Sequence, residues 1–550
     1  MFAFVLGRLF YVQIIWGETL QEKAIDQWTR EIPIIATRGE IVDINGVVIA
    51  SNEDTFTVFV RKKAISDIEK VAKALSTVLE LEYDYVFQRL TKTISSEVTI
   101  KKQVSKEKID QLLTYGFSGV YYSRDNTRKY PYGDFMSAVL GFTSNDGKGQ
   151  AGLEAYYDKF LSGINGEILY ETDIVGIEID GGKASYIPAT DGLNVKLTVD
   201  YEIQQFCETA LEEIMQIHSP KSAQILVMDP SCGAIRALAL KPSFNPNEPP
   251  RNDLSLLNAL TRNGMFCDMY EPGSTFKIIT TSANIEEYYK GNPKAFSTSY
   301  IFNSSRYRYI DGQKVKCWNN HNNGKHSALN IQGALNNSCN PIFVDIAMSL
   351  GKKTMYEYIN KFNFGNVTGV DFSGESQGMV LPESSALNVD LARIAFGQTI
   401  AVTGIQLASA VCAVVNGGNY YEPYLVEEIY DDNGIIVEKN KGKLINKVIS
   451  ESTSRLMCEL LEGVVRDGSG SQAYIDGYRV FGKTGTAQKY ENGVIAQGKY
   501  VSSFIGGFPT DNPKYLALVI VDEPIGQYYG STVAAPYAKI VFENIINTKS

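Results

Sequence analysis

The chain has 550 residues, more than one ordinary domain holds, so two or three domains are expected. A hydrophobic content of 44% and a charged content of 21% are typical of a globular protein and exclude a disordered chain. The net charge is −10 and no long basic run occurs, which argues against nucleic-acid binding. The seven cysteines begin at Cys207 and lack regular spacing, so no disulfide framework is expected.

The first 16 residues are apolar, but they carry Arg8 and Gln13 and are too short for a bilayer, which takes about 20 residues. Two interpretations are open: a surface helix, or the outer end of a membrane anchor that begins upstream. Arg8, Tyr11 and Trp16 suit a membrane interface. We interpret residues 1–16 as the remnant of an N-terminal membrane anchor.

Residues 17–195 mix short strand-like runs with helical stretches. Glu40–Ala50 and Thr55–Val60 are strand-like, whereas Ala64–Leu81 and Lys106–Tyr115 have helical periodicity. No pair of a nucleophile and a base occurs in this region beyond what chance would give. The sequence therefore predicts a scaffold here.

A second unit is predicted to begin at residue 196. Tyr201–Ile217 is predicted to be a helix with Asp200 as its N-cap, followed by strands at Ala223–Asp229 and Ala234–Leu240. Helical stretches dominate from 253 to 470. Strand-like runs return at Tyr478–Thr484, Ser502–Phe508 and Tyr515–Val521. Strands at both ends of a unit, with helices between them, predict one antiparallel sheet with a large helical insertion.

The first residues whose types and spacing suggest catalysis are Ser274 and Lys277, just after a Pro-Gly pair that breaks regular structure. If a helix begins there, the two side chains share one face, and the hydroxyl lies where free N–H groups favour negative charge. A serine beside an amine can act as a nucleophile. The pattern alone is weak evidence, because Ser105 and Lys108 also form it, on what is more simply a solvated helix face.

Two further motifs follow in chain order. Ser338-Cys339-Asn340 is an S-x-N, and Lys483-Thr-Gly485 is a K-T-G on a predicted strand. Together with S-x-x-K they resemble the penicillin-binding protein and serine β-lactamase superfamily. The surrounding segments resemble class B penicillin-binding proteins, the monofunctional peptidoglycan D,D-transpeptidases, similar to those of spore-forming Gram-positive bacteria. Arg38-Gly-Glu and Gly152-Leu-Glu154 resemble motifs of the pedestal domain of that family.

The resemblance implies an α+β multidomain protein. Residues 196–550 would have the transpeptidase and serine β-lactamase-like fold, an antiparallel sheet with a helical subdomain. Residues 17–195 would form an elongated mixed α/β pedestal of the dimerisation type. A single-pass anchor would hold the protein in the cell membrane, with the catalytic domain on the extracellular face. The implied partners are stem peptides ending in D-Ala-D-Ala, β-lactams and a membrane glycan polymerase; whether the protein serves elongation, septation or spore-cortex synthesis stays open.

The resemblance also implies residue roles. Ser274 would attack the penultimate D-Ala carbonyl, and Lys277 would be its base if burial and a cation such as Lys483 keep its amine neutral. Ser338 would relay a proton, and Asn340 would hold both Lys277 and the substrate. The residues implied to bind substrate on the K-T-G strand are Thr484, Gly485 and Thr486. The backbone N–H groups of Ser274 and Thr486 would form the oxyanion hole.

Three alternatives stay open: two other enzyme classes on this fold, and a non-catalytic protein of a different class. A D,D-carboxypeptidase would hydrolyse the acyl-enzyme, and a non-catalytic β-lactam sensor or scaffold would only bind the drug. Intact Lys277, Ser338 and Lys483 argue against a scaffold. A β-lactamase would leave the first 195 residues unexplained.

Thiols and imidazoles near these motifs suggest a metal site, although acyl transfer itself needs no cofactor. Cys267, Asp268, Cys317 and His326 offer the thiolate, carboxylate and imidazole groups that bind Zn²⁺, and we predict a structural zinc site from them. Among class B relatives of spore-forming bacteria, some have a histidine that lines up with His326. The spacing fits no standard zinc motif, so buried thiols and polar loop histidines remain the alternative.

Overall fold

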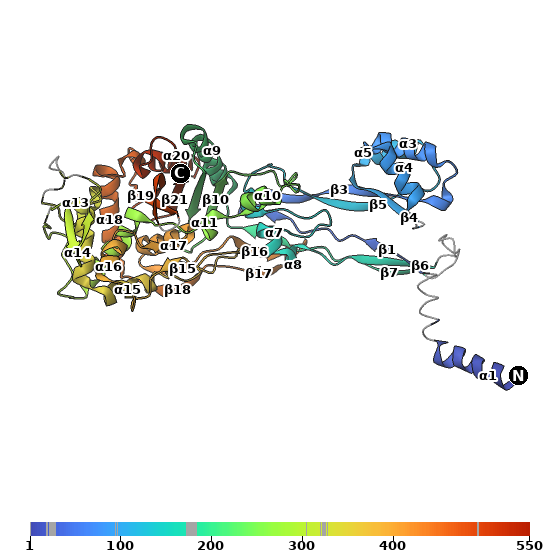
Figure 1. Cartoon of the computed structure of the whole chain (residues 1–550), viewed down its shortest axis with the longest axis horizontal. Helices are drawn as coiled ribbons and strands as arrows, with labels where there is room; N and C mark the ends of the chain where they lie inside the picture. The colour runs from blue at the N-terminus through green and yellow to red at the C-terminus, as the bar shows by residue number, and fades with distance from the viewer. Residues whose placement is uncertain are drawn as a thin grey trace.

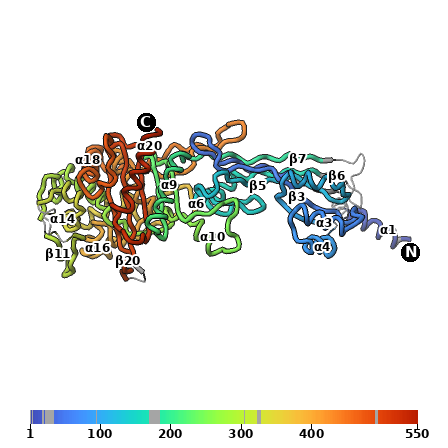
Figure 2. Tube along the Cα trace, turned by 90° about the horizontal axis from the view of Figure 1, so that it is seen from above, coloured from blue at the N-terminus to red at the C-terminus, as the bar shows by residue number. Residues whose placement is uncertain are grey.

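The computed structural model describes residues 2–17, 20, 29–93, 95, 97–171, 184–303, 305–319, 321, 326, 328–491 and 494–549. The molecule is elongated, with a globular C-terminal unit at one end and a narrow N-terminal unit that extends away from it (Figures 1 and 2). The predicted α+β multidomain fold, an antiparallel sheet with helices next to a mixed α/β pedestal, is confirmed.

The C-terminal unit is built on a five-stranded antiparallel sheet in the order β10-β9-β21-β20-β19. Its strands are β9 (Ser222–Met228), β10 (Ile235–Lys241), β19 (Phe481–Glu491), β20 (Val494–Phe508) and β21 (Tyr515–Asp522). Strands from the two ends of the unit therefore pair, as the sequence predicts. β19, which carries the K-T-G, is an edge strand, so one side of its backbone is not paired within the sheet.

Helices cover both faces of this sheet. On β9, Ile225 and Val227 pack on the side of α9 (Tyr201–His218) and α20 (Ala535–Lys549), whereas Leu226 and Met228 belong to the core on the other side. The predicted helix at 201–217 is confirmed as α9, and the Asp200 carboxylate accepts hydrogen bonds from its first backbone N–H groups.

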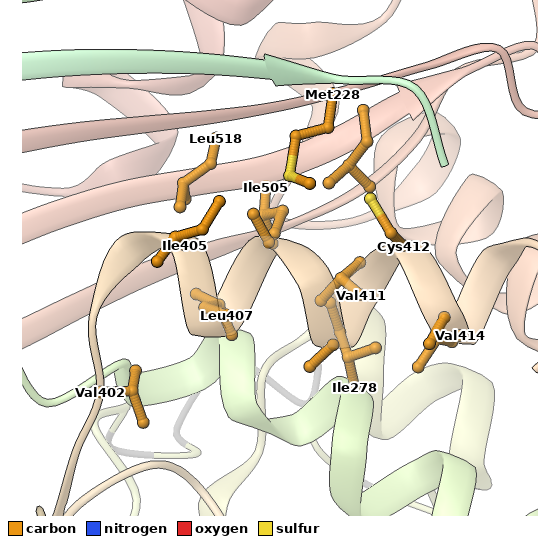
Figure 3. Packing of buried hydrophobic residues seen from close by; sticks show 14 of the residues in the cluster. Met228, Ile278, Val402, Ile405, Leu407, Val411, Cys412, Val414, Ile505 and Leu518 are labelled. Carbon is orange, nitrogen blue, oxygen red and sulfur yellow. The ribbon is translucent and has the colours of Figure 1, made fainter. Parts of the chain in front are cut away.

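The second face of the sheet rests on α17 (Gly404–Val415), in which every residue is buried. Figure 3 shows this helix between sheet residues Met228, Ile505 and Leu518 and the helix that carries Ile278. A helix that is buried on all sides and mostly apolar is typical of a core. The turn that carries Ser274 immediately precedes the helix of Ile278, so this core supports the site directly.

Most of the remaining helices of the C-terminal unit form the predicted helical subdomain. They are α10 (Leu254–Thr261), α11 (Gly264–Cys267), α12 (Lys277–Tyr289), α13 (Ile331–Asn336), α14 (Asn340–Leu350), α15 (Lys352–Lys361), α16 (Asn388–Ile394) and α18 (Glu451–Asp467). The short helix α19 (Gly530–Val533) lies outside this subdomain and packs on α20, β19 and β20.

Short strands that the sequence analysis missed interrupt this helical region. They are β11 (Tyr307–Ile310), β12 (Gln313–Lys316), β13 (Met379–Val380), β14 (Ile400–Ala401), β15 (Asn419–Glu422), β16 (Val426–Tyr430), β17 (Ile436–Lys439) and β18 (Lys443–Lys447). All residues of β17 are exposed, so no alternation of apolar and polar residues marks it. β16 pairs with β8 (Asn194–Leu197), which joins the two units in one sheet.

The N-terminal unit extends as long strands toward a helical head at its far end (Figure 1). Its main sheet has the order β17-β16-β8-β2-β3-β4, and β5 pairs with β3. The strands and helices of this sheet and head are β2 (Ile41–Val42), β3 (Val48–Arg61), β4 (Glu97–Val104), β5 (Val120–Lys129), α3 (Ile68–Leu79), α4 (Tyr83–Lys92) and α5 (Lys106–Thr114). A smaller sheet contains β1 (Thr29–Ile34), β6 (Gly166–Glu171) and β7 (Ala184–Ile187), and three short helices are α6 (Ser137–Leu140), α7 (Gly152–Tyr156) and α8 (Asp158–Leu161).

The two pedestal motifs meet in a buried ion cluster. The Glu154 carboxylate has no exposure and accepts from Arg38 Nε at 2.7 Å and from Arg128 Nε at 2.6 Å. Arg38 also reaches Asp158, at 2.7 Å. Ion pairs that bring residues so distant in sequence together hold the base of the pedestal in one arrangement.

At the N-terminus, α1 (Phe2–Phe10) is followed by a turn of π-helix, Tyr11–Ile15. Phe2 and Phe4 are more than 80% exposed, at 82% and 84%. Within the described part of the chain, no helix has the length and apolar character needed to cross a membrane.

Candidate active site

Ser274 lies in a short 3₁₀ turn, Gly273–Phe276, that leads directly into α12 at Lys277. Side chains three residues apart eclipse each other in such a turn. Lys277 Nζ accordingly lies 3.0 Å from Ser274 Oγ. The structure thus brings the two residues of the S-x-x-K together, as the sequence analysis expects.

Glycines allow a second segment to support this turn closely. Gly397 has φ +81°, and a Cβ atom there would lie 2.1 Å from the Gly273 carbonyl oxygen. The Gly397 carbonyl accepts from the Gly273 N–H at 2.9 Å. Beside it, the Glu271 carboxylate accepts from the Thr399 N–H at 2.8 Å. The backbone that positions Ser274 is therefore held from behind by residues 397–399.

Ser338 occupies a backbone position that usually requires glycine. It follows α13 with φ +50°, its N–H bonds to the Leu335 carbonyl, and the Cys339 N–H bonds to the Ala334 carbonyl. These two bonds form a Schellman motif, in which glycine is the usual left-handed residue. Ser338 Oγ lies 2.9 Å from Ser274 Oγ and 3.0 Å from Lys277 Nζ. A strained serine here places a hydroxyl where glycine would have none.

Lys277 is fully buried and surrounded by acceptors. Besides the two serine hydroxyls, its Nζ lies 2.9 Å from the Ser338 carbonyl and 2.7 Å from Asn340 Oδ1. Burial lowers the pKa of Lys277 to about 8, which keeps a sizeable fraction of its amine neutral near physiological pH.

Lys483 is also fully buried, and burial together with the charge of Lys277 lowers its pKa. The sequence analysis expects burial and the charge of Lys483 to lower the pKa of Lys277. In the structure, burial lowers the pKa of Lys277, whereas the Cys317 and Cys339 side chains raise it.

The K-T-G strand forms the other wall of the site. Lys483 Nζ and Thr484 Oγ1 each lie 3.3 Å from Ser469 Oγ, so three groups that can bind a carboxylate gather there. A Cβ at Gly485 would lie 2.4 Å from Ser503 Oγ and 3.1 Å from the Pro272 carbonyl oxygen, so glycine permits close packing of the strand. Thr486 Oγ1 accepts from the Gly530 N–H at 3.0 Å, which fixes its side chain.

Sequence reasoning missed Ser469. It lies in a Gly-Ser-Gly segment directly after α18, and such segments are common in loops. Its N–H donates to the Asn336 carbonyl at the end of α13, at 2.9 Å, and its hydroxyl contacts Lys483 and Thr484 of the K-T-G strand.

Four metal-binding side chains do gather next to the S-x-N, but the set differs from the predicted one. Ligand atoms of Cys317, His321, His326 and Cys339 all lie within 4.8 Å of one another. The prediction of Cys267 and Asp268 as members is wrong. Cys267 Sγ instead bonds to the Gly374 carbonyl at 3.1 Å, and Asp268 pairs with an arginine of its own segment, Arg262, at 2.6 Å.

The chemistry of this Cys/His cluster suits a soft metal ion. His326 is 2% exposed, and its Nδ1 is buried without a hydrogen-bond partner among the described residues. The rings of His321 and His326 stack at 4.1 Å. Hydrogen bonds from the Cys339 thiol, the Asn319 backbone and His321 lower the pKa of the Cys317 thiol toward the thiolate that binds metals.

Comparisons with known families match both units of the chain. A family profile described as "Penicillin binding protein transpeptidase domain" matches residues 223–547. A second, described as "Penicillin-binding Protein dimerisation domain", matches residues 33–197.

Individual relatives extend over nearly the whole chain. The Bacillus subtilis protein named Stage V sporulation protein D is 39% identical, covering 98% of this chain and 82% of that protein. A Mesostigma viride protein named as a Peptidoglycan D,D-transpeptidase FtsI homolog is 31% identical, covering 100% and 94%. The crystal structure of Penicillin Binding Protein 2X from Streptococcus thermophilus is 23% identical with a TM-score of 0.77, covering 94% and 81%, and shows the shared fold.

Proposed function

The chain belongs to the class B penicillin-binding proteins, the peptidoglycan D,D-transpeptidases, and we propose that it catalyses acyl transfer through Ser274. One observation supports this assignment above others. Ser274 Oγ, Lys277 Nζ and Ser338 Oγ form a triangle with sides of 3.0, 3.0 and 2.9 Å. A nucleophile, a base and a relay within hydrogen-bond reach of one another meet the requirements of covalent catalysis.

In the acylation step, the neutral Lys277 amine takes the proton of Ser274 while Ser274 Oγ bonds to the penultimate D-Ala carbonyl carbon. The resulting oxyanion would be held by the N–H groups of Ser274 and Thr486. The C–N bond then breaks, and the departing D-Ala amine receives the proton from Lys277 through the Ser338 hydroxyl. An amine of a neighbouring strand would attack the ester in turn and return the proton to Ser274.

Substrate binding would use the K-T-G strand and the S-x-N. Lys483, Thr484 and Ser469 would bind the terminal carboxylate, and Thr486 would stay oriented by Gly530. The Asn340 amide can donate to the substrate backbone while its oxygen holds Lys277. The open edge of β19, including Gly485, can pair with an extended peptide.

Mass spectrometry after incubation with a penicillin tests the nucleophile. We expect one adduct per chain, located on Ser274 and lost in Ser274→Ala. An adduct that persists in Ser274→Ala would refute the assignment. Incubation with a purified stem peptide, with and without an acceptor amine, then separates transfer from hydrolysis. Release of D-Ala without a cross-linked product would indicate a D,D-carboxypeptidase. No release of D-Ala at all would indicate a β-lactam sensor.

The second-order rate constant of penicillin acylation should increase with pH. Because the base must be neutral and the pKa of Lys277 is lowered to about 8, we expect a single rising limb with its midpoint near that value. The second-order rate constant, measured at drug concentrations well below saturation from about pH 6 to about pH 9.5, reports the pKa of the free protein. A rate that is flat across this range would show that deprotonation of Lys277 does not control acylation.

Gly397→Ala should displace the turn that carries Ser274, because the added Cβ would overlap the Gly273 carbonyl oxygen. We expect a loss of about 1–3 kcal/mol in stability from overpacking. A displacement on the order of 1 Å would also lower the acylation rate about 100-fold. Thermal unfolding and acylation kinetics measure the two effects.

Gly291→Ala is the matched control for this variant. Gly291 also has positive φ, +78°, but a Cβ there meets no atom within 4 Å. It introduces backbone strain without a clash and should leave acylation unchanged. Equal acylation rates in the two variants would contradict the supporting role of Gly397.

We further propose that Cys317, His321, His326 and Cys339 hold a structural Zn²⁺. Two thiolates and two imidazoles complete a tetrahedral set, which leaves no open position for a catalytic water. Bound there, the ion would fasten the loop of Cys317 to the S-x-N through Cys339. The residues of the acyl-transfer triangle need no metal for their own proton transfers.

Metal analysis of chelator-treated protein tests this site. We expect about one zinc per chain, reduced in Cys317→Ser and in His326→Ala and unchanged in Cys267→Ser, which lies outside the cluster. Less than about 0.2 zinc per chain with normal acylation would refute the site.

The membrane and the partners are also proposals. The exposed apolar side chains of α1 support our interpretation of residues 1–16 as the remnant of a membrane anchor. Residues 17–195 would then be the pedestal, and residues 196–550 the transpeptidase domain on the extracellular face. A membrane glycan polymerase would supply the strands that are cross-linked. Co-purification of the tagged full-length protein from membranes should recover such a polymerase, and its consistent absence would contradict the partnership.

A further inference from the structure

The indole N–H of Trp318 contacts backbone carbonyls of the turn that carries the S-x-N. Its indole Nε1 lies 3.1 Å from the Ser338 carbonyl oxygen and 3.3 Å from the Asn337 carbonyl oxygen. An indole has a single N–H, so one donor is shared between two successive carbonyls. The orientation of both peptide groups around Ser338 is thereby tied to one side chain.

This backbone needs such support. Ser338 adopts φ +50°, a left-handed conformation in which residues with a Cβ are strained. The Ser338 carbonyl also accepts from Lys277 Nζ at 2.9 Å, so Lys277 and Trp318 together fix the peptide that follows the relay hydroxyl. Rotation of this peptide would move Ser338 Oγ away from Ser274 Oγ, 2.9 Å distant.

The ring of Trp318 is itself oriented by its neighbours. It meets the His326 ring at 6.5 Å and the Tyr529 ring at 6.4 Å, both edge to face. Yet Trp318 is 56% exposed. Burial of apolar surface therefore accounts poorly for a large ring at this position, whereas the N–H contact with the turn accounts for it directly.

We propose that Trp318 is a positioning residue for acylation, whose indole N–H holds the Ser338 peptide so that the Ser338 hydroxyl can relay the proton. This inference rests on the relay role proposed above for Ser338. Trp318 touches neither Ser274 Oγ nor Lys277 Nζ in the hydrogen bonds of the described residues, so its effect is indirect.

Trp318→Phe tests the inference, because it keeps an aromatic ring and removes the indole N–H. Losing one hydrogen bond should lower the limiting acylation rate about fivefold. The apparent dissociation constant for penicillin, the zinc content and the melting temperature should stay unchanged. Tyr529→Phe is the matched control: it keeps the ring against Trp318, leaves the turn untouched and should acylate at the normal rate.

A double-mutant cycle with Ser338→Ala shows whether the effect passes through the hydroxyl. We expect the fivefold effect of Trp318→Phe to fall below about twofold in the Ser338→Ala background. An equal effect in both backgrounds, or a change confined to the dissociation constant, overturns the inference. If Ser338→Ala lowers the rate but Trp318→Phe does not, this inference alone fails; if Ser338→Ala acylates normally, the proposed relay fails as well.

Discussion

Lys277→Ala should reduce the rate of penicillin acylation at least about 1,000-fold, within the range that a positioned general base contributes. Without the amine, the hydrogen bond with Ser338 Oγ is the one that Ser274 Oγ retains among the described residues, and neither hydroxyl is a base. The Ser338 carbonyl and Asn340 Oδ1 lose the donor they share. One substitution therefore removes the base and also disturbs the relay residue Ser338 and the substrate-binding amide of Asn340.

The protein should still fold in this variant. Burial lowers the pKa of Lys277 to about 8, so the folded state binds the proton less tightly than the unfolded chain does. The sign follows: the charged lysine opposes folding below about pH 8, and that cost fades as the pH rises toward the usual lysine pKa. Removing the amine therefore removes the free-energy cost of burying its charge near neutral pH, and circular dichroism should show a native spectrum.

Lys108→Ala is the matched control, because Ser105 and Lys108 repeat the same pattern on α5. There Ser105 precedes the helix, and Lys108 Nζ pairs with the exposed Glu80 at 2.7 Å. Acylation should not change in this variant. If Lys277→Ala acylates within about tenfold of the unmodified chain, the assignment of Lys277 as base is wrong.

The sequence predicts the members of the acyl-transfer triangle because each comes from a motif of fixed spacing. Ser274 and Lys277 are adjacent on one turn, so local geometry alone brings them together. The metal cluster shows where this reasoning stops. Cys339 joins Cys317 and His321 only through the fold, and the short distance in sequence from Cys267 to the nucleophile carries no information about side-chain direction.

The fold follows the same division. The apolar strands β9 and β21 and the capped helix α9 are evident from sequence, because burial on two faces and an N-cap leave local patterns. β16 and β17 leave none, since β17 is fully exposed and β16 exists through its pairing with β8, more than 200 residues earlier. Long-range pairing of this kind is tertiary information that local propensity does not contain.

Glu154→Ala should destabilise the pedestal by about 3–5 kcal/mol, because it leaves two buried cations without their shared carboxylate. Arg128 is 2% exposed in its side chain and bonds Glu154 at 2.6 Å. Arg38 retains Asp158, but Arg128 has no second carboxylate among the ion pairs of the described residues. Tyr130 loses a hydrogen bond to Glu154 as well, 3.3 Å long.

Asp158→Ala provides the comparison, since Asp158 is 34% exposed and Arg38 is its one ion-pair partner among the described residues. A partly solvated ion pair is typically worth about 1 kcal/mol or less, so this variant should lose much less stability than Glu154→Ala.

Pulse proteolysis in urea reports opening of the pedestal, and penicillin acylation reports the C-terminal unit separately. We expect Glu154→Ala to shift the first measurement strongly and the second little, because the acyl-transfer triangle lies wholly within the C-terminal unit. Equal shifts in the two variants would show that Glu154 is not the centre of the cluster.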